Sequence, residues 1–416
     1  MESTFIILFS IASLVAFAVR RTSIPYTVGL VVVGLVAGQF QFVSPPQLTK
    51  DLLFALFLPG LVFEAAYNLH VTELRSSWRA IATLAVPGVI ISIGLVAAAM
   101  FFSFRLIDSS AGMDWRTSVV FAALVAATDP IAVVALFRQL GVPQRLTTLV
   151  EAESLFNDGT SIVVLSLVLA FVTGTGSSVA ALSLQFVLVI GGGVLVGGAL
   201  AFGIARLAKH VDDPMLEIQL TTIAAYGSFV VAERLHLSGV IATVTAGLVL
   251  GTYGREISMS RATRLSVDTF WQYVAFALNS IVFLLIGFSV RPTTLLASAG
   301  AIAIAFIAVV VARGGVVFGV MAALSRTTER FSAGWATVIT WGGLRGALSM
   351  VLALALPIDF PNRGLLIDLT FGVVVVSIVV QGTTMHHLIK WRGLVRDTDT
   401  HLGGAHSPDP LPTADQ

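Results

Sequence analysis

Three carboxylates stand together at the head of an apolar stretch, residues 150–164. They are Glu151, Glu153 and Asp158, and the apolar residues continue beyond them for long enough to enter a lipid bilayer. A charge inside a membrane segment costs at least about 2.5–3.5 kcal/mol, so such residues usually face a cavity, a partner charge or an ion path. The stretch therefore predicts a functional site within a membrane.

The spacing of the polar residues in this stretch separates them into two sets. Residues four apart share a helix face, and neighbours are rotated by about 100°. In a helix, Ser154 and Asp158 line one face, whereas Glu153 and Asn157 line the adjacent one. The two pairs are therefore expected to meet different surroundings.

The composition indicates a polytopic membrane protein. Of 416 residues, 56% are hydrophobic and 11% are charged, against roughly 25% charged in ordinary soluble domains. The net charge of +1 argues against a nucleic-acid partner, and the absence of cysteine excludes disulfides and thiolate metal sites. No nucleotide-binding motif is present, so we expect a secondary transporter rather than an enzyme, with no cofactor.

Apolar runs of membrane-spanning length, about 20 residues, recur along the chain. They predict an all-α protein of about thirteen transmembrane helices, the first of which we interpret as a retained span and not as a signal peptide. Their approximate limits are 3–19, 25–43, 51–69, 80–104, 117–138, 147–173, 179–207, 214–233, 237–253, 268–290, 293–323, 333–357 and 366–390.

Loop charge predicts the orientation. With the N-terminus outside, sixteen Lys and Arg residues fall in one set of connections and six in the opposite set, which leaves two of the 24. The positive-inside rule then places the richer set and the C-terminus in the cytoplasm, and we expect the plasma membrane. The remaining two, Arg313 and Arg345, lie inside predicted spans, and residues 393–416 are expected to be a short disordered tail.

Two predicted spans contain interruptions. In the fifth, Pro130 follows Asp129 and has no N–H, so the carbonyl of Ala126 loses its helical donor. In the twelfth, Gly342, Gly343 and Gly346 surround Arg345. A proline kink and a glycine packing face would explain each break separately, but not the charges at both.

Broken helices in corresponding positions of two halves indicate an inverted-repeat transporter with a site at the bilayer midplane. We therefore expect one transmembrane domain, residues 1–392. It would contain one repeat at about 3–173, a linking helix at about 179–207 and a second repeat at about 214–390.

Four segments together carry a resemblance to a known family. They are Phe63-Glu64-Ala65-Ala66, Ala127-Thr128-Asp129-Pro130, Glu153-Ser154-Leu155-Phe156-Asn157-Asp158-Gly159 and Gly342-Gly343-Leu344-Arg345-Gly346-Ala347. They resemble the sodium/proton exchanger family, in its NhaP-type branch of monovalent cation:proton antiporters. The resemblance implies Na+ or Li+ as cargo, with K+ as an alternative, and a homodimer in the lipid bilayer.

The chemistry of the residues agrees with that resemblance. A partly dehydrated alkali cation should want several hard oxygen ligands, by analogy with divalent ions. Asp158, Asp129, Ser154 and Thr128, or carbonyls freed at the break, could supply them as a monovalent metal site. Asp158 would bind the cation when ionised and release it when protonated.

The resemblance also implies roles for the remaining polar residues. It pairs Glu153 with Arg313 as a structural contact, and it implies that Glu64 approaches the ion, although Glu64 could equally bond locally near Asn68. Arg345 could offset Asp129, complement half-helix dipoles or pair with Glu153. Asn157, where some relatives have a second acid, implies electroneutral exchange.

Other functions require different features. A potassium/proton antiporter of the same fold would use the same residues, and a cation channel would use the same ligands but needs a continuous pore. A carrier of anions or organic solutes would not need Asp129 and Asp158 together. A membrane scaffold without transport has no use for buried acids.

Overall fold

The structure, a computed structural model, describes residues 2–19, 25–39, 50–107, 113–174, 178–209, 213–257, 259–325 and 331–395. Within these ranges every regular element is helical, which confirms the predicted all-α class. Residues 396–416 of the predicted tail lie outside the described residues.

The first half of the described chain contains eleven α-helices and two π-helical turns. They are α1 (Glu2–Val19), α2 (Tyr26–Gln39), α3 (Lys50–Leu52), η1 (Leu53–Phe57), α4 (Leu58–Tyr67), α5 (Val71–Ser76), α6 (Trp78–Thr83), η2 (Leu84–Gly88), α7 (Val89–Ile107), α8 (Trp115–Leu124), α9 (Ile131–Leu140), α10 (Gln144–Val172) and α11 (Val179–Ala208).

The second half of the described chain is built in the same way. Its elements are α12 (Pro214–Arg234), α13 (Gly239–Val249), η3 (Leu250–Gly254), α14 (Arg255–Ile257), α15 (Arg261–Ser289), α16 (Pro292–Ala297), α17 (Ala299–Leu324), α18 (Ala333–Trp341), α19 (Ala347–Leu354), α20 (Arg363–Val376), η4 (Ser377–Gln381) and α21 (Gly382–Trp391).

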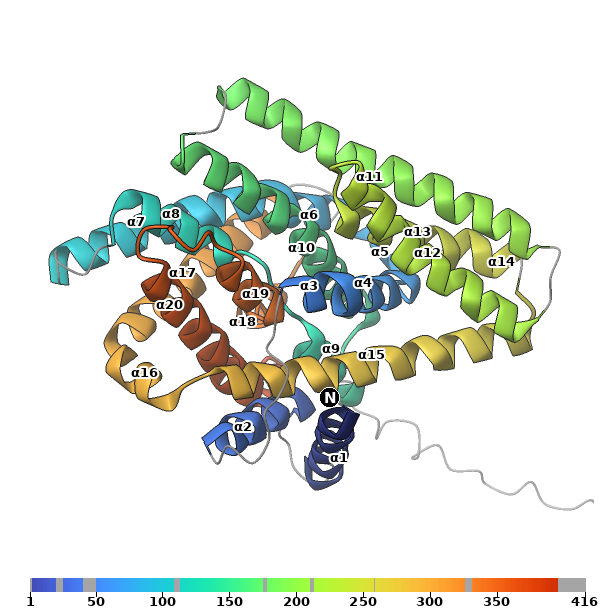
Figure 1. Cartoon of the computed structure of the whole chain (residues 1–416), viewed down its shortest axis with the longest axis horizontal. Coiled ribbons are helices and arrows are strands. Elements are labelled where there is room, and N and C mark those ends of the chain that lie inside the picture. The colour runs from blue at the N-terminus through green and yellow to red at the C-terminus, as the bar shows by residue number, and fades with distance from the viewer. Residues whose placement is uncertain are drawn as a thin grey trace, which may run out of the picture.

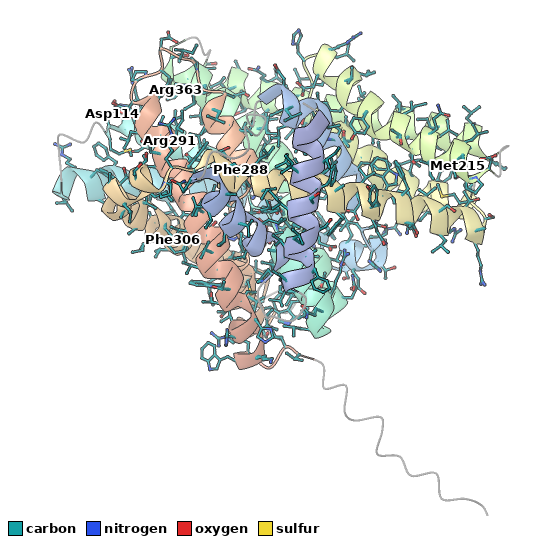
Figure 2. All side chains as sticks on the ribbon, turned by 60° about the horizontal axis from the view of Figure 1, so that its bottom comes forward. Asp114, Met215, Phe288, Arg291, Phe306 and Arg363 are labelled. Atoms are coloured by element: carbon teal, nitrogen blue, oxygen red, sulfur yellow. The ribbon has the colours of Figure 1, made fainter. Side chains whose placement is uncertain are left out.

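Each predicted span overlaps one of these helices or a run of consecutive ones. Seven helices of the described residues are long and apolar enough to cross a membrane, and four shorter apolar helices overlap the first, second, third and fifth predicted spans. In Figure 2, Asp114, Arg291 and Arg363 are labelled toward one end of the molecule and Met215 toward the other. The division into two inverted repeats and a linking helix remains a prediction.

The helices pack as two groups (Figure 1). One group, here called the flanking bundle, consists of α1, α2, α4, α11, α12, α13 and α15, which contact mainly one another. The other, here called the crossing bundle, consists of α6 to α10 and α17 to α21. Helix α10 joins them, because it also contacts α4, α11 and α13.

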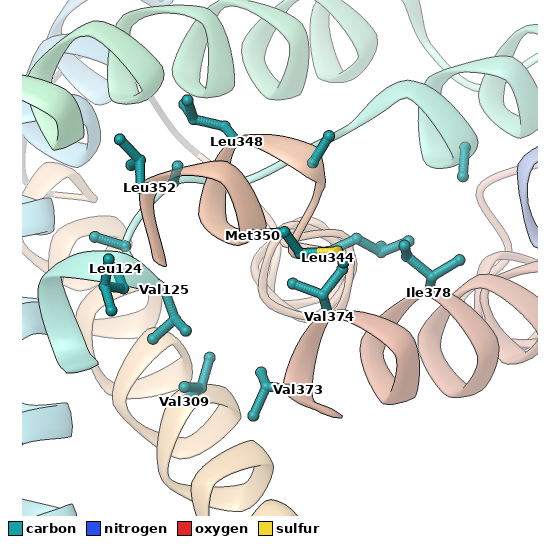
Figure 3. Packing of buried hydrophobic residues seen from close by; sticks show 14 of the residues in the cluster. Leu124, Val125, Val309, Leu344, Leu348, Met350, Leu352, Val373, Val374 and Ile378 are labelled. Carbon is teal, nitrogen blue, oxygen red and sulfur yellow. The ribbon is translucent and has the colours of Figure 1, made fainter. Parts of the chain in front are cut away.

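Both predicted interruptions are present in the crossing bundle. The chain leaves helical geometry between α8 and α9, and again between α18 and α19. Apolar side chains surround the second break (Figure 3), where Leu344 and Met350 lie near Val374 and Ile378. All four are buried. Since lipid is as apolar as leucine, close van der Waals packing rather than water exclusion holds such helices together.

Candidate functional site

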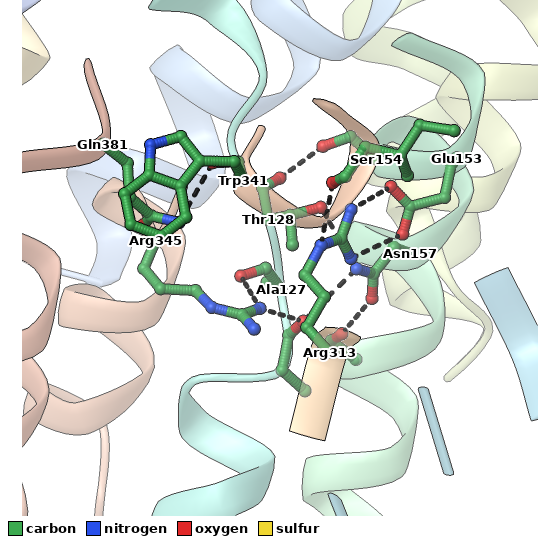
Figure 4. Close-up of polar contacts among 12 residues, drawn as sticks. Ala127, Thr128, Glu153, Ser154, Asn157, Arg313, Trp341, Arg345 and Gln381 are labelled. Carbon is green, nitrogen blue, oxygen red and sulfur yellow. Dashed lines mark hydrogen bonds and ion pairs between the residues drawn. The ribbon is translucent and has the colours of Figure 1, made fainter. Parts of the chain in front are cut away.

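The two interrupted helices meet and bond to each other (Figure 4). The backbone N–H of Asp129, in the first break, donates to the carbonyl oxygen of Leu344, in the second, over 2.8 Å. The side chain of Asp129 also contacts the start of α9, because its Oδ1 accepts a hydrogen bond from the N–H of Ile131 over 3.1 Å. The crossing therefore fixes the Asp129 backbone and one of its carboxylate oxygens.

The carbonyl groups freed at the first break have side-chain donors. Arg345 Nη1 donates to the carbonyl oxygens of Ala126 over 2.7 Å and Ala127 over 3.0 Å. Asn157 Nδ2 also donates to Ala126 over 3.2 Å. Ser154 Oγ donates to the carbonyl oxygen of Thr128. These donors replace the helical N–H groups that the break removes, which is how non-helical backbone is tolerated at membrane depth.

The contacts of Arg345 bear on the three roles considered for it. Its guanidinium lies on the carbonyls that follow α8, where the helix dipole presents partial negative charge. Among the described residues, no carboxylate lies within ion-pair distance of Arg345. Among the described residues Arg345 thus forms no ion pair with Glu153, and its contact with the carbonyls matches the half-helix alternative. Its offset of the Asp129 charge across the crossing remains a prediction.

Glu153 and Arg313 are brought together from α10 and α17. Arg313 Nη2 lies 2.9 Å from Glu153 Oε2, and Nη1 lies 3.2 Å from Oε1, which makes a bidentate pair. Arg313 Nε also donates to the carbonyl oxygen of Ile339 at 3.3 Å. Both side chains are buried, so the pair links α10 to α17 and to the end of α18.

Asn157, on the same face of α10 as Glu153, bonds to the first break. Asn157 Nδ2 donates to Thr128 Oγ1 over 3.2 Å, and Asn157 Oδ1 accepts from Ser161 Oγ over 2.7 Å. The second break has a similar arrangement, since Ser377 Oγ accepts from the backbone N–H of Arg345 over 3.0 Å and Gln381 donates to Trp341. In each half, the helix after the broken one supplies its polar partners.

A cavity of about 440 Å³ reaches this crossing. Asp129, Asp158, Ser154 and Thr128 line it, together with residues of α4 and α15 from the flanking bundle. Among the described residues, the carboxylate of Asp158 has neither a hydrogen-bond partner nor an ion-pair partner. Its oxygens therefore face the cavity without a protein partner.

Glu64 lines the same cavity from the flanking bundle. Its Oε1 accepts a hydrogen bond from Asn68 Nδ2 over 2.9 Å, which is the local bond considered for it. Its approach to the ion remains a prediction. Glu151 also lines the cavity and pairs with Arg138 at 2.7 Å. The nearer basic residue in sequence, Arg145, instead bonds Ser77 over 2.9 Å.

Two glycines make this close packing possible. A Cβ atom on Gly343 would overlap the guanidinium of Arg313, and one on Gly346 would overlap the carboxylate of Asp129. Neither glycine has a positive φ, so space, not backbone conformation, requires them. The glycines of the second break thus leave room for the guanidinium of Arg313 and the carboxylate of Asp129.

Several residues of the site were missed from the sequence. Ser161 could have been found from its i+4 spacing to Asn157, the same spacing that links Glu64 to Asn68. Ser377 and Gln381 carry no local signal, because their partners belong to a distant span. Asn279 of α15 lines the cavity, and its Oδ1 is buried without a hydrogen-bond partner among the described residues.

Comparison with known proteins places the chain in a family. Residues 6–391 match the family model described as sodium/hydrogen exchanger, transmembrane. The Na+/H+ antiporter ApNhaP of Aphanothece halophytica is 41% identical over 378 residues, which are 90% of this chain and 71% of that protein. The low-affinity Na+/H+ antiporter NhaS1 of Synechocystis is 39% identical over 399 residues, covering 94% of this chain and 74% of that protein.

A solved structure has the same fold. The sodium proton antiporter MjNhaP1 of Methanocaldococcus jannaschii at pH 8 aligns with a TM-score of 0.76 and 19% identity, over 94% of this chain and 98% of that one. The family match spans nearly all of the membrane region, including both breaks and the cavity. The chain therefore belongs to the sodium/hydrogen exchanger family.

Proposed function

We propose that this protein is a secondary antiporter that exchanges Na+ for H+ across the membrane, with both ions competing for Asp158. Its relatives ApNhaP and NhaS1 are named Na+/H+ antiporters, which favours sodium over potassium. The observation that carries the assignment to Asp158 is its free carboxylate on the cavity wall. A carboxylate without a protein partner can take either a proton or a cation.

The neighbouring oxygens are suited to complete a cation site. Ser154 Oγ uses its proton to bond Thr128, so its lone pairs remain available to a metal. Asp129 Oδ1 is engaged with the N–H of Ile131, whereas Oδ2 has no hydrogen-bond partner within the described residues. Two carboxylates, a hydroxyl and the backbone of Thr128 make a hard oxygen set of the kind that Na+ or Li+ prefers.

The ion pair on the adjacent face has a different role. Glu153 is held at both oxygens by Arg313, so it is not free to exchange ions. We assign the pair to structure, joining the helix that carries Asp158 to α17. Asn157, which bonds the break instead of bearing charge, leaves Asp158 as the alternating carrier and implies electroneutral exchange.

Purified protein in liposomes tests this function. Adding Na+ outside vesicles loaded with acid buffer and a pH dye should drive proton movement, with Li+ as a second substrate and K+ and choline as comparisons. Potassium giving the only response would support a K+/H+ antiporter. A cation flux that does not move protons would indicate a channel.

The membrane arrangement belongs to the same proposal. We infer that the N-terminus lies outside and the C-terminus in the cytoplasm, on the basis of the sixteen-to-six distribution of basic residues in the connections. The plasma membrane and the homodimer are proposed from the family resemblance alone. Accessibility of single cysteines to an impermeant thiol reagent tests the orientation, because the chain has no cysteine of its own.

A further inference from the structure

The flanking bundle holds Glu64 with one oxygen engaged and one free. Glu64 and Asn68 are four residues apart at the end of α4, so they share a face, and both line the cavity. Asn68 Nδ2 donates to Oε1 of Glu64 over 2.9 Å. The other oxygen, Oε2, has no hydrogen-bond partner in the described part of the chain. Only Oε2 is thus open to a ligand.

Arg255 fixes the orientation of Asn68 in turn. Arg255 Nη2 donates to Asn68 Oδ1 over 2.9 Å and to Asp268 Oδ1 over 2.5 Å. Its guanidinium lies 4.2 Å from the ring centroid of Tyr67, which is fully buried. An arginine can only donate and a carboxylate mainly accepts, so the amide of Asn68 can satisfy both partners in one orientation alone.

The amide separates the arginine from the carboxylate. Where an arginine meets a glutamate directly, as Arg313 meets Glu153, it occupies both oxygens. A metal cation would then have to displace it. At Glu64 the interposed amide keeps the carboxylate in place without a positive charge on its oxygens. One oxygen of the carboxylate therefore remains free.

All members of this network belong to the flanking bundle or the turn attached to it. Glu64 and Asn68 are at the end of α4, Arg255 begins α14 and Asp268 is on α15. Asp129 and Asp158 face the same cavity from the crossing bundle. Helix α4 lies between α10 and α15 in Figure 1 and contacts both. The cavity is thus lined by acidic side chains from both bundles.

We propose that Asn68 is a positioning residue that presents Glu64 to the incoming cation, with Arg255 and Asp268 as its anchor. Glu64 is the acidic residue that the family resemblance already implies near the ion, and the new element is the hold that Asn68 has on it, which leaves one oxygen open to the cavity. This inference rests on the proposed function, since it requires a monovalent cation in the cavity.

The test compares variants of Asn68 in proteoliposomes by Na+-driven proton movement. For Asn68→Ala we expect the KM for Na+ to rise about tenfold, with kcat within about twofold, because one hydrogen bond to a charged group is lost. In a Glu64→Gln background, the same substitution should change KM by less than about twofold. Thr269→Ala is the matched control, because Thr269 is exposed and bonds only the Leu265 carbonyl of its own helix.

Asp268→Asn provides a second variant that preserves shape, and it should raise KM by about threefold through the weakened hold on Arg255. If the wild-type protein is active but neither Asn68→Ala nor Asp268→Asn changes the KM for Na+, the inference is overturned. An equal KM increase with and without Glu64 would also overturn it, because the effect would then not act through that carboxylate. Inactive wild-type protein would instead overturn the proposed function.

Discussion

The backbone N–H of Asp129 donates to the carbonyl oxygen of Leu344 over 2.8 Å, and this bond joins the two interrupted helices at their crossing. Each break would otherwise leave backbone groups without helical partners inside the membrane. By bonding to each other and to Arg345, Ser154 and Asn157, the breaks satisfy those groups. The crossing is therefore a hydrogen-bonded frame that holds Asp129 at the wall of the cavity that Asp158 also lines.

Replacing Asp158 by asparagine should abolish Na+-driven proton movement while the protein remains folded. The substitution removes the only group assigned to bind both ions but keeps the shape of the side chain. Asp158→Glu is expected to retain weak exchange with altered cation affinity. Exchange near the wild-type rate in the asparagine variant, measured with a pH dye in liposomes, would exclude Asp158 as the carrier.

Glu153→Ala should lower thermal stability in detergent, because it leaves the charge of Arg313 buried and unpaired. The loss is expected to reach about 3–5 kcal/mol for a broken buried pair. The double substitution with Arg313→Ala should recover part of it, and the apparent affinity for cation should change less than stability does. A single variant that unfolds at the wild-type temperature yet loses cation competition would mean that Glu153 faces the ion site.

Gly346→Ala should strongly reduce exchange, since the added Cβ overlaps the carboxylate of Asp129. Gly343→Ala should mainly reduce stability, since its Cβ overlaps the guanidinium of Arg313. Gly315→Ala is the control, because a Cβ there meets nothing within 4 Å. Transport assays and thermal unfolding of the three variants would separate these effects. Equal behaviour of Gly346→Ala and Gly315→Ala would contradict the close approach to Asp129.

Exchange should be electroneutral. One carboxylate that alternates between a proton and a monovalent cation carries the same charge in both directions, provided that Asp129 keeps one protonation state. The rate should therefore not change when potassium and valinomycin set a membrane potential, once potassium is shown not to be a substrate. A steady-state current that scales with turnover would show that a second group, Asp129 or Glu64, also carries protons.

Activity should pass through a maximum as pH is varied. At low pH, protons occupy Asp158 and exclude Na+; at high pH, protons are too scarce to reload the carrier. Raising the Na+ concentration should therefore move the acidic limb to lower pH and leave the alkaline limb in place. Measuring initial rates at two Na+ concentrations checks this, and an acidic limb that does not move would argue against competition for one site.

The sequence alone was sufficient to predict those properties that depend on short segments. Apolar runs of spanning length indicated the membrane helices, because length and hydropathy are local properties. Pro130 and the glycines around Arg345 predicted the two breaks, because each removes helical hydrogen bonds or packing within a few residues. The family resemblance supplied the expected pairing of Glu153 with Arg313, and the family itself is confirmed.

Only the tertiary structure decided which distant groups meet. Arg345 had three possible roles in the sequence, and the packing of α19 against α8 places it on the carbonyls of Ala126 and Ala127. Likewise, Glu151 bonds Arg138 rather than Arg145, and Asn68 connects Glu64 to Arg255. Helical periodicity tells which face a side chain occupies. Its partner depends on how separate helices cross, which no local pattern encodes.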